Sequence, residues 1–555
     1  MTGALPEPEA RRLVCHAIQL HVDGKLDAAV DAYRTILEQH PEAAACWSNL
    51  GVALRGLGRK DEALQALREG ERRCPAAADV RCNLANALTE AGDHEGALER
   101  YRAVLAGDPG HLRAAVGGGE TLLRLRRFDQ AVDHYRTALA RHPDNARLCH
   151  ALGAALWNLG RVEAAAAVWR RALAVGPAPA AWRLNLHRAL SALGRYAEDE
   201  RQLREAPAPD AGSPAVLAAL GQTLVSQGRV DAGVECFDAA LAADPDHLDA
   251  RLGRARANFL AGRYRAAWPD FRWRRRHRQW RPPSVTGRDW EGQDLRGQSI
   301  LLYGEQGLGD VIQFVRYAPL VTQRGARVLL YCPPRLTGLL QRLPEVAEVV
   351  PTDRPAPETD WICPLLDLPG VLGTDIDSIP GACPYLPSRT PASRLLPATR
   401  QFRVGIVWAG NPANQRDRHR SCRLDEFAPL LDLVGAEFLS FQVGPRAAEL
   451  RGSGWRGLIG EAGDELAPFE ATADALAEVD LVITVDTAMA HLAGALGRPV
   501  WTLLPFAPDW RWLLGRIDTP WYPTMRLFRQ PAPNDWAGAF RAVRRVLTAR
   551  LAERS

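Results

Sequence analysis

The sequence predicts an α + α/β protein, with helical hairpins in its first half and two doubly wound parallel sheets in its second half. Three observations lead to this prediction. Four types of residue recur every 34 positions in the first half. This register ends at Pro282–Pro283. From Ser299 onward, short apolar runs alternate with glycine-rich turns and amphipathic stretches, and this pattern occurs twice.

The chain has 555 residues, of which 47% are hydrophobic and 24% charged, and its formal net charge is +4. This length exceeds what one hydrophobic core supports, and the small charge excess argues neither for nor against an anionic partner. The ten cysteines include no C-x-x-C pair, which is typical of a reducing compartment. No apolar run reaches about 18 residues, and the N-terminus lacks the apolar core of a secretory signal. We therefore expect a cytoplasmic protein without a transmembrane segment.

The 34-residue register has a physical explanation. Glycine ends the first helix of each hairpin, where a positive φ is needed, and alanine lets the two antiparallel helices approach closely. A bulky residue fills the space to the next repeat, and proline stops the second helix. The prolines are Pro41, Pro75, Pro109, Pro143, Pro177 and Pro245, and the glycines are Gly24, Gly58, Gly92, Gly160, Gly194, Gly228 and Gly262, with Arg126 in the remaining position. The alanines are Ala29, Ala63, Ala97, Ala131, Ala165 and Ala267, and the bulky residues are Tyr33, Leu67, Tyr101, Tyr135, Trp169, Leu203, Phe237 and Phe271. Residues 9–281 are therefore predicted to form about eight hairpins, with the sixth degenerate.

A period of 34 residues with Leu-Gly near the start of the unit, as at Leu50–Gly51 and Leu152–Gly153, resembles the tetratricopeptide repeat. The resemblance implies that the hairpins stack into a superhelix with a concave groove. Such grooves usually hold an extended peptide or another protein. The alternative is a spacer or a dimerisation arm, because a repeat defines architecture and not ligand.

Arginine and tryptophan alternate where the repeats end, between Arg272 and Arg281. This pattern is compatible with nucleic-acid binding or with the end of the last repeat helix docking on the next domain. The patch is short and the net charge is close to zero, so we favour docking and expect no nucleic-acid partner. Because the register is lost at Pro282–Pro283, we expect the two halves to fold separately, with the boundary between Arg281 and Gly297.

The second half is predicted to contain two lobes, residues 297–390 and 400–552, joined by a Pro/Ser/Arg-rich linker at 386–400. A helix is expected from Val311 to about Arg324. Alternation of strands and helices predicts a parallel, doubly wound sheet in each lobe, with a cleft between the lobes. The expected strands are Ile300–Tyr303, Val328–Tyr331, Val349–Val350, Trp361–Ile362, Val404–Trp408, Phe438–Phe441, Leu481–Val485 and Val500–Leu504.

Four motifs in the second half resemble those of known transferases. Gly307-Leu308-Gly309-Asp310 is similar to the glycine-rich loop of the heptosyltransferase-like (family 9 type) glycosyltransferases, and the stretch from Asp486 to Gly494 is similar to that family's second signature. The stretches 405–412 and 508–512 resemble a branch that also carries tetratricopeptide repeats. The resemblance implies a tetratricopeptide-repeat superhelix followed by a two-Rossmann-lobe (GT-B type) glycosyltransferase domain.

The resemblance implies that Asp310 is the general base for the acceptor hydroxyl. Asp310 follows the first strand, at the edge where open sheets bind ligands. A helix N-cap is the alternative role, and one residue can serve both. Gly307 and Gly309 would let the backbone approach a ligand closely.

The second lobe is expected to bind the donor. A strand end followed by a helix start is a ready anion site, and the resemblance adds a donor role for the histidine one turn into the helix. The alternatives are a packed, satisfied histidine and, for the arginines, a solvated run of charge. The expected donor-binding residues are Asp486, Thr487, Ala488, His491, Arg418, Arg420 and Asn411. Trp510 and Arg511 are expected to contact the sugar or, alternatively, to pack in the core.

No metal site is predicted. Asp375-Ile376-Asp377 matches the D-x-D pattern of metal-dependent glycosyltransferases, but it lies in a Gly/Pro loop away from both signatures, so we interpret it as incidental. We expect no cofactor, only a nucleotide-diphosphate sugar as substrate. Related chains carry Asp-Thr-Ala before the strand at Leu481, where this chain has Glu470, a possible substitute for the contact to the nucleotide.

Three functions are compatible with the sequence. The leading hypothesis is a glycosyltransferase that moves a sugar from a nucleotide-diphosphate donor to an acceptor hydroxyl, on a protein or peptide held by the repeat groove. The second is a non-catalytic repeat scaffold with a vestigial transferase domain. The third is a heptosyltransferase acting on lipopolysaccharide core, which would leave the repeats without a role.

Overall fold

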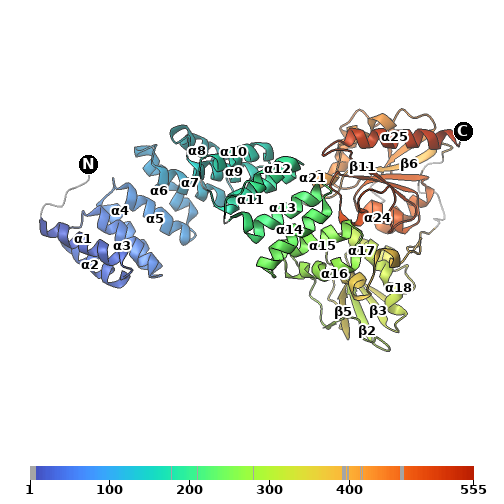
Figure 1. Ribbon diagram of the computed structural model, residues 1–555, viewed down its shortest axis with the longest axis horizontal. Coiled ribbons are helices and arrows are strands. Elements are labelled where there is room, and N and C mark those ends of the chain that lie inside the picture. The colour runs from blue at the N-terminus through green and yellow to red at the C-terminus, as the bar shows by residue number, and fades with distance from the viewer. Residues whose placement is uncertain are drawn as a thin grey trace. The chain divides into compact units, whose positions relative to one another are not determined.

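The computed structural model describes residues 8–176, 178–208, 210–278, 280–389, 396, 399–412, 414, 417–462 and 468–554 (Figure 1). It divides into two compact units, Met1–Leu193 and Gly194–Ser555. The first unit consists of helices, and the second begins with helices and continues into two sheets. Pro177, Gln279 and much of the predicted 386–400 linker lie outside the described residues.

Sixteen α-helices precede the first strand within the described residues, the number that eight hairpins require. In the first unit they are α1 (Pro8–Val22), α2 (Leu26–Gln39), α3 (Ala44–Gly56), α4 (Lys60–Arg73), α5 (Ala78–Glu90), α6 (His94–Gly107), α7 (Leu112–Arg124), α8 (Phe128–Arg141), α9 (Ala146–Asn158), α10 (Val162–Ala174) and α11 (Ala180–Ala192). In the second unit they are α12 (Tyr196–Arg204), α13 (Pro214–Ser226), α14 (Val230–Ala243), α15 (Leu248–Leu260) and α16 (Tyr264–Phe271). The short helix η2 (Arg272–Arg276) follows α16 directly.

The predicted turn column is confirmed. Each repeat glycine has a positive φ, between 70° and 88°, and ends the first helix of its hairpin. Arg126, which occupies the one position without glycine, has a φ of 57°. Few residues other than glycine adopt this conformation, so the hairpin geometry imposes it even where the sequence departs from the pattern.

The Leu-Gly pair inside the first helix also has a packing reason. A side chain at Gly221 would place its Cβ 2.8 Å from the ring of Phe237, which is the bulky residue of the same hairpin. Gly51 and Leu67, and Gly153 and Trp169, show the same relation. The missing Cβ therefore makes room for the bulky residue that fills each hairpin.

The first sheet is parallel, with the strand order β1-β5-β2-β3-β4. Its strands are β1 (Arg288–Asp289), β2 (Ser299–Tyr303), β3 (Arg327–Cys332), β4 (Glu348–Pro351) and β5 (Trp361–Pro364). Its other elements are α17 (Leu308–Phe314), η3 (Val315–Tyr317), α18 (Ala318–Thr322), α19 (Pro334–Leu340), η4 (Leu365–Asp367), α20 (Leu368–Val371) and η5 (Ile376–Ser378). Strands β2 and β5 lie side by side at its centre, where the strand order reverses.

The second sheet is also parallel, with the strand order β11-β10-β9-β6-β7-β8. Its strands are β6 (Phe402–Val407), β7 (Ala436–Ser440), β8 (Ile459–Glu461), β9 (Leu481–Val485), β10 (Val500–Leu504) and β11 (Met525–Arg529). Its α-helices are α21 (Asp417–Arg420), α22 (Ala448–Arg451), α23 (Phe469–Ala475), α24 (Ala488–Ala495) and α25 (Trp536–Ala552), with short helices η6 (Leu424–Leu430), η7 (Pro445–Ala447), η9 (Leu476–Glu478) and η10 (Trp510–Trp512). The strand order reverses between β6 and β9, which defines a topological switch point.

All eight predicted strands are present, but the helix expected from Val311 to Arg324 differs. It is divided into α17, η3 and α18. Pro319 lies in this stretch and has no N–H to continue the α-helical hydrogen bonding. Strands β1, β8 and β11 were not predicted from the sequence.

One hydrophobic core joins the last repeats to both sheets. It contains Phe237 and Phe259 of the repeats, Ile300 of β2, and Val482 and Val500 of the second sheet. The compact units divide earlier, between Leu193 and Gly194, because the final repeat helices pack into this shared core. A folding boundary between Arg281 and Gly297, and the predicted domain limits, stay predictions.

Candidate functional site

Polar side chains from both sheets meet in the second unit. Asp310 lies in the first turn of α17, which follows the glycine loop, residues 304–307, at the carboxyl end of β2. Asp486 follows β9 directly, and Arg511 lies in η10, in the 505–513 loop after β10. These positions are the strand ends at which open α/β sheets bind ligands.

Asp310 and Arg511 form the central contact of this cluster. Asp310 Oδ1 pairs with Nη2 of Arg511. Asp310 is the third residue of α17, and its Oδ2 accepts a hydrogen bond of 2.9 Å from the amide of Gly307, the N-cap of this helix. The Asp310 side chain keeps 18% of its surface exposed. Asp310 is therefore not the N-cap itself but bonds to the N-cap amide, and its carboxylate stays within reach of solvent.

Arg511 is buried and forms ion pairs or hydrogen bonds with several polar side chains. Its Nη1 pairs with Asp509 at 2.8 Å, and its Nε donates to Gln313 Oε1 at 2.6 Å. The guanidinium also lies 4.5 Å from the ring centroid of Trp510. Neither Asp509 nor Gln313 was assigned a role from the sequence. The spacing Asp509-x-Arg511 was the one available signal, since a carboxylate two residues from an arginine can fix its orientation.

Asp486 is buried at the switch point between β6 and β9. Burial and, to a smaller extent, the nearby charge of Asp509 raise the pKa of its carboxyl to about 6, while a hydrogen bond from Trp512 and the charges of Arg420 and Arg511 act in the opposite direction. The cluster thus contains a carboxyl group that titrates close to neutral pH.

The start of α24 contacts the start of α17. Thr487 is the N-cap of α24, and its hydroxyl accepts a hydrogen bond of 3.3 Å from the Met489 amide. A Cβ at Gly309 would lie 2.7 Å from Cδ2 of His491 and 3.4 Å from Cα of Ala488. Gly309 was expected to give space to a ligand, and in this structure the space is used by α24. Gly307 is the N-cap of α17 and has a negative φ.

His491 lies inside the core. Only 5% of it is exposed, its Nδ1 is 2.8 Å from the Tyr522 hydroxyl, and its ring stacks on Trp512 with centroids 5.4 Å apart. Burial lowers the pKa of His491 to about 3. The histidine is therefore neutral at physiological pH and has the environment of a packing residue.

The polar loop after β6 supplies further cations. Arg420 pairs with the buried Asp417 at 3.3 Å, and Gly410 lies against both side chains. Arg418 and Asn411 are exposed. Trp510, a predicted sugar contact, is only 5% exposed and stacks on Phe259 of α15 with centroids 4.2 Å apart. The core-packing alternative therefore describes its surroundings.

The remaining sequence hypotheses concern acidic residues. Asp375 caps η5 and pairs with Arg265 at 3.3 Å. The Glu470 carboxylate lies against Gly338 of α19. Among the residues that the structure describes, no group of three or more His, Cys, Asp or Glu side chains is arranged to hold a metal ion.

A cavity of about 360 Å³ lies between α16 and α20. It is lined by Arg265, Trp268, Pro269, Phe271, Arg272, Glu291, Leu366, Asp367, Gly370, Val371 and Gly373. It is therefore separate from the cluster around Asp310 and Arg511, none of whose members line it.

The comparisons with known proteins agree with this architecture. Models of the tetratricopeptide repeat match residues 22–78, 88–156, 122–184 and 218–272. The model of glycosyltransferase family 9 (heptosyltransferase) matches residues 467–509, which include Asp486, Thr487, His491 and Asp509. The chain thus carries tetratricopeptide repeats and a segment, residues 467–509, that is similar to glycosyltransferase family 9. None of its described helices is both long and apolar enough to cross a membrane.

Among individual proteins, the chain is 27% identical to Protein FlbA of Caulobacter vibrioides over 413 residues, which are 62% of this chain and 68% of FlbA. A tetratricopeptide repeat protein from Parabacteroides merdae is 16% identical, with a TM-score of 0.33, and covers 45% of this chain and 98% of its own. YrrB, described as a TPR protein with an unusual peptide-binding site, is 24% identical, with a TM-score of 0.30, and covers 34% of this chain and 96% of its own.

Proposed function

We propose that this protein transfers a sugar from a nucleoside-diphosphate sugar to an acceptor hydroxyl. The observation that carries the proposal is the pairing of Asp310, which follows the first strand of one parallel sheet, with Arg511, which lies at the carboxyl edge of the other. A carboxylate and a cluster of cations at facing strand ends are what this reaction needs. The family 9 match over residues 467–509 adds support.

The proposal assigns the two sheets to the two Rossmann-like lobes of a GT-B transferase. Read as β8-β7-β6-β9-β10-β11, the second sheet has the 3-2-1-4-5-6 order known from dinucleotide-binding folds. The first sheet has the same order for β4-β3-β2-β5. In this proposal the second lobe holds the donor, and the first lobe supplies Asp310.

The donor diphosphate would lie at the switch point between β6 and β9. Thr487 and the first amides of α24 face this edge, and a helix start attracts anions. Arg420, with Arg418 on the same short helix, would neutralise charge on the departing diphosphate. No divalent metal is required in this scheme, because guanidinium groups supply the positive charge.

Asp310 would act as general base. It takes the proton of the acceptor hydroxyl while the hydroxyl oxygen bonds to the anomeric carbon and the bond to the diphosphate breaks. Arg511 and the Gly307 amide hold the two carboxylate oxygens in fixed directions. Positioning of this kind is what makes proton transfer efficient. His491 is assigned to packing against Tyr522 and Trp512, instead of to donor contact.

The repeats would bring the acceptor. Stacked tetratricopeptide hairpins form extended surfaces that suit a polypeptide, and the repeat models match 218–272, which ends next to the sheets. We therefore propose a hydroxyl on a protein or peptide as acceptor. A heptose donor and a lipopolysaccharide acceptor remain a separate outcome of the test below.

A thermal-shift panel of nucleoside diphosphates and their sugars tests the proposal. A ligand at 100 times its dissociation constant adds about 2.7 kcal/mol to stability, so the cognate nucleotide will raise the melting temperature. Hydrolysis or transfer of that sugar is then measured for the parent chain, Asp310→Asn and Asp377→Asn. Asp377 is an exposed carboxylate of the D-x-D pattern, and its variant is expected to match the parent. A panel without any shift would favour the non-catalytic scaffold.

A further inference from the structure

The segment that follows the last repeat helix fills the carboxyl edge of the first sheet. Two buried carboxylates lie at this edge, Glu305 in the glycine loop after β2 and Asp367 in η4 after β5. Their strands, β2 and β5, are neighbours at the switch point. This edge is the position at which a doubly wound sheet ordinarily receives a ligand, and here the chain's own arginines occupy it.

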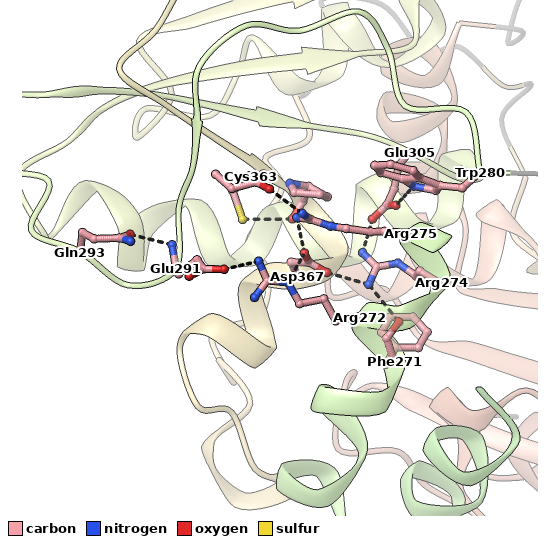
Figure 2. A network of polar contacts seen from close by, with 12 residues as sticks. Phe271, Arg272, Arg274, Arg275, Trp280, Glu291, Gln293, Glu305, Cys363 and Asp367 are labelled. Atoms are coloured by element: carbon pink, nitrogen blue, oxygen red, sulfur yellow. Dashed lines mark hydrogen bonds and ion pairs between the residues drawn. The ribbon is translucent and has the colours of Figure 1, made fainter. Parts of the chain in front are cut away.

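Figure 2 shows these arginines and their partners. Arg274 pairs with Glu305 and, at 2.6 Å, with Asp367. Arg275 pairs with Asp367 as well. Trp280 donates from Nε1 to the second oxygen of Glu305 at 2.6 Å. The Glu305 side chain has no exposed surface, so its charge depends on these donors.

The network acts directly on the loop that leads to Asp310. Glu305 lies in the short connection between β2 and α17, Asp310 lies in the first turn of α17, and the Gly307 amide between them bonds to Asp310. A displacement of Glu305 would therefore move the N-cap of α17. Through Arg274, the end of the repeats fixes the position of the proposed base.

The last repeat hairpin, α15–α16, directly precedes the short helix η2 that carries Arg274, and it also contacts the loop that carries Arg511. Arg256 of α15 donates to the Pro508 carbonyl at 3.1 Å. The ring of Phe259 stacks on Trp510, at 25° between the planes. Trp510 and Arg511 are adjacent, so this stacking holds the 505–513 loop against α15. One hairpin therefore touches both loops whose meeting creates the Asp310–Arg511 pair.

We propose that the hairpin α15–α16, together with η2, positions the two loops that form the transferase site. Arg274 and Phe259 are positioning residues: Arg274 sets the glycine loop, and Phe259 sets the 505–513 loop. The chemical consequence rests on the proposed function, but the mechanical coupling does not.

Hydrogen exchange on the full chain tests the coupling without a substrate. Arg274→Met is compared with Arg276→Met, its matched control, because Arg276 lies in the same short helix and its side chain is 65% exposed. We expect amides of residues 304–312 to exchange about tenfold faster or more in Arg274→Met, while those in α2–α10 stay unchanged. Phe259→Leu is expected to speed exchange in residues 508–514 instead.

Kinetics supply the second readout. With the nucleotide sugar found in the thermal-shift panel, Arg274→Met is expected to lower kcat at an unchanged KM for the donor, and Arg274→Lys to recover part of it. Exchange at 304–312 equal to that of Arg276→Met would overturn the proposal. If Arg274→Met does not fold, Arg274→Lys and Phe259→Leu decide by the same regional exchange. If the parent turns over no sugar nucleotide, the proposed function fails, whereas the exchange result still decides the coupling.

Discussion

Asp310 and Arg511 are 201 residues apart in the chain, and their side chains form an ion pair between the helix after β2 and the loop after β10. Arg511 is more than nine-tenths buried and also contacts Asp509 and Gln313. The pair therefore joins the two sheets at the edges where each would bind a ligand. Its behaviour is open to several direct measurements.

Arg511→Gln is expected to destabilise the protein. The substitution removes the cation that faces Asp310 and Asp509 and leaves their charges without it, a change that typically costs about 3–5 kcal/mol when the pair is buried. Urea titration of the full chain measures the loss in the free energy of unfolding. Arg511→Gln with Asp509→Asn should recover part of it, because one of the facing charges is then gone.

Arg516→Gln is the control for this experiment. Arg516 pairs with Asp518, whose side chain is 64% exposed, and an exposed pair contributes about 1 kcal/mol or less. If the two arginine variants lost the same free energy of unfolding, the buried ion pairs of Arg511 would not contribute more to stability than an exposed pair, which would contradict this prediction.

Gly309→Ala is expected to destabilise the contact between α17 and α24. Its Cβ would lie 2.7 Å from His491, and that ring is held by Tyr522 and Trp512. Overpacking of a well-packed site costs about 1–3 kcal/mol. Gly457→Ala is the matched control, since no atom lies within 4 Å of the added Cβ. Melting temperatures that are the same for both variants would show that the helices do not approach this closely.

His491 is expected to make the fold sensitive to acid. Burial lowers its pKa from 6.5 to about 3, so the unfolded chain binds a proton that the folded chain excludes. Its contribution is present above pH 6.5 and is lost as the pH falls through this window. Between pH 7 and pH 5 the loss amounts to about 2 kcal/mol for such a group.

His491→Gln should therefore lose less stability than the parent over the same pH range, because the amide does not titrate. His16→Gln, at an exposed histidine of the other compact unit, serves as control. The carboxyl of Asp486 has the opposite effect on the pH dependence of stability. Its pKa is raised from 3.8 to about 6 in the folded chain, so it stabilises the fold at low pH, and this stabilisation is lost as the pH rises through 6. If the parent and His491→Gln respond to acid in parallel, the burial of a neutral His491 is refuted.

Chelation tests the metal-free scheme. The proposal uses Arg420, Arg418 and the start of α24 to stabilise the diphosphate, so EDTA should leave binding of the cognate nucleotide and turnover unchanged. Thermal shift and rate are measured with EDTA and again after excess Mg²⁺ or Mn²⁺. Loss of binding in EDTA that the metal restores would rule out this scheme.

Local patterns predicted most of the fold. The repeat columns determine turns that the chain must form locally, and even Arg126 takes the positive φ of the glycine it replaces. The eight predicted strands consist mainly of apolar residues, as expected for parallel strands covered on both faces. The strands that were missed lie at or near sheet edges: β1 has two exposed residues, and β11 contains Arg526 and Arg529. Because these strands contain polar residues, a search for apolar runs does not find them.

The sequence predicted several of the residues that make up the site, but it did not predict how their side chains are arranged. The motifs identified the strand ends that carry Asp310 and Asp486, because a strand followed by glycine and a helix is a local pattern. The pairing of Asp310 with Arg511 depends on how two sheets meet, and sequence spacing holds no information on that. For the same reason, the sequence left two roles open for the motif histidine His491, donor contact and core packing, and its surroundings are a tyrosine and a tryptophan in the core.

Turnover of Asp310→Asn is the most direct test of the central claim, that Asp310 is the base of a sugar-transfer site. Asparagine keeps the size and most of the capping capacity, and Arg511 keeps its contacts to Asp509 and Gln313. Donor affinity and melting temperature should therefore change little, whereas the rate should fall about 100- to 10,000-fold. Asp310→Ala should lose the rate and also about 1 kcal/mol of stability, because the hydrogen bond from the Gly307 amide is lost. An Asp310→Asn variant as active as the parent would contradict this claim and leave Asp310 as a residue that only stabilises the start of α17.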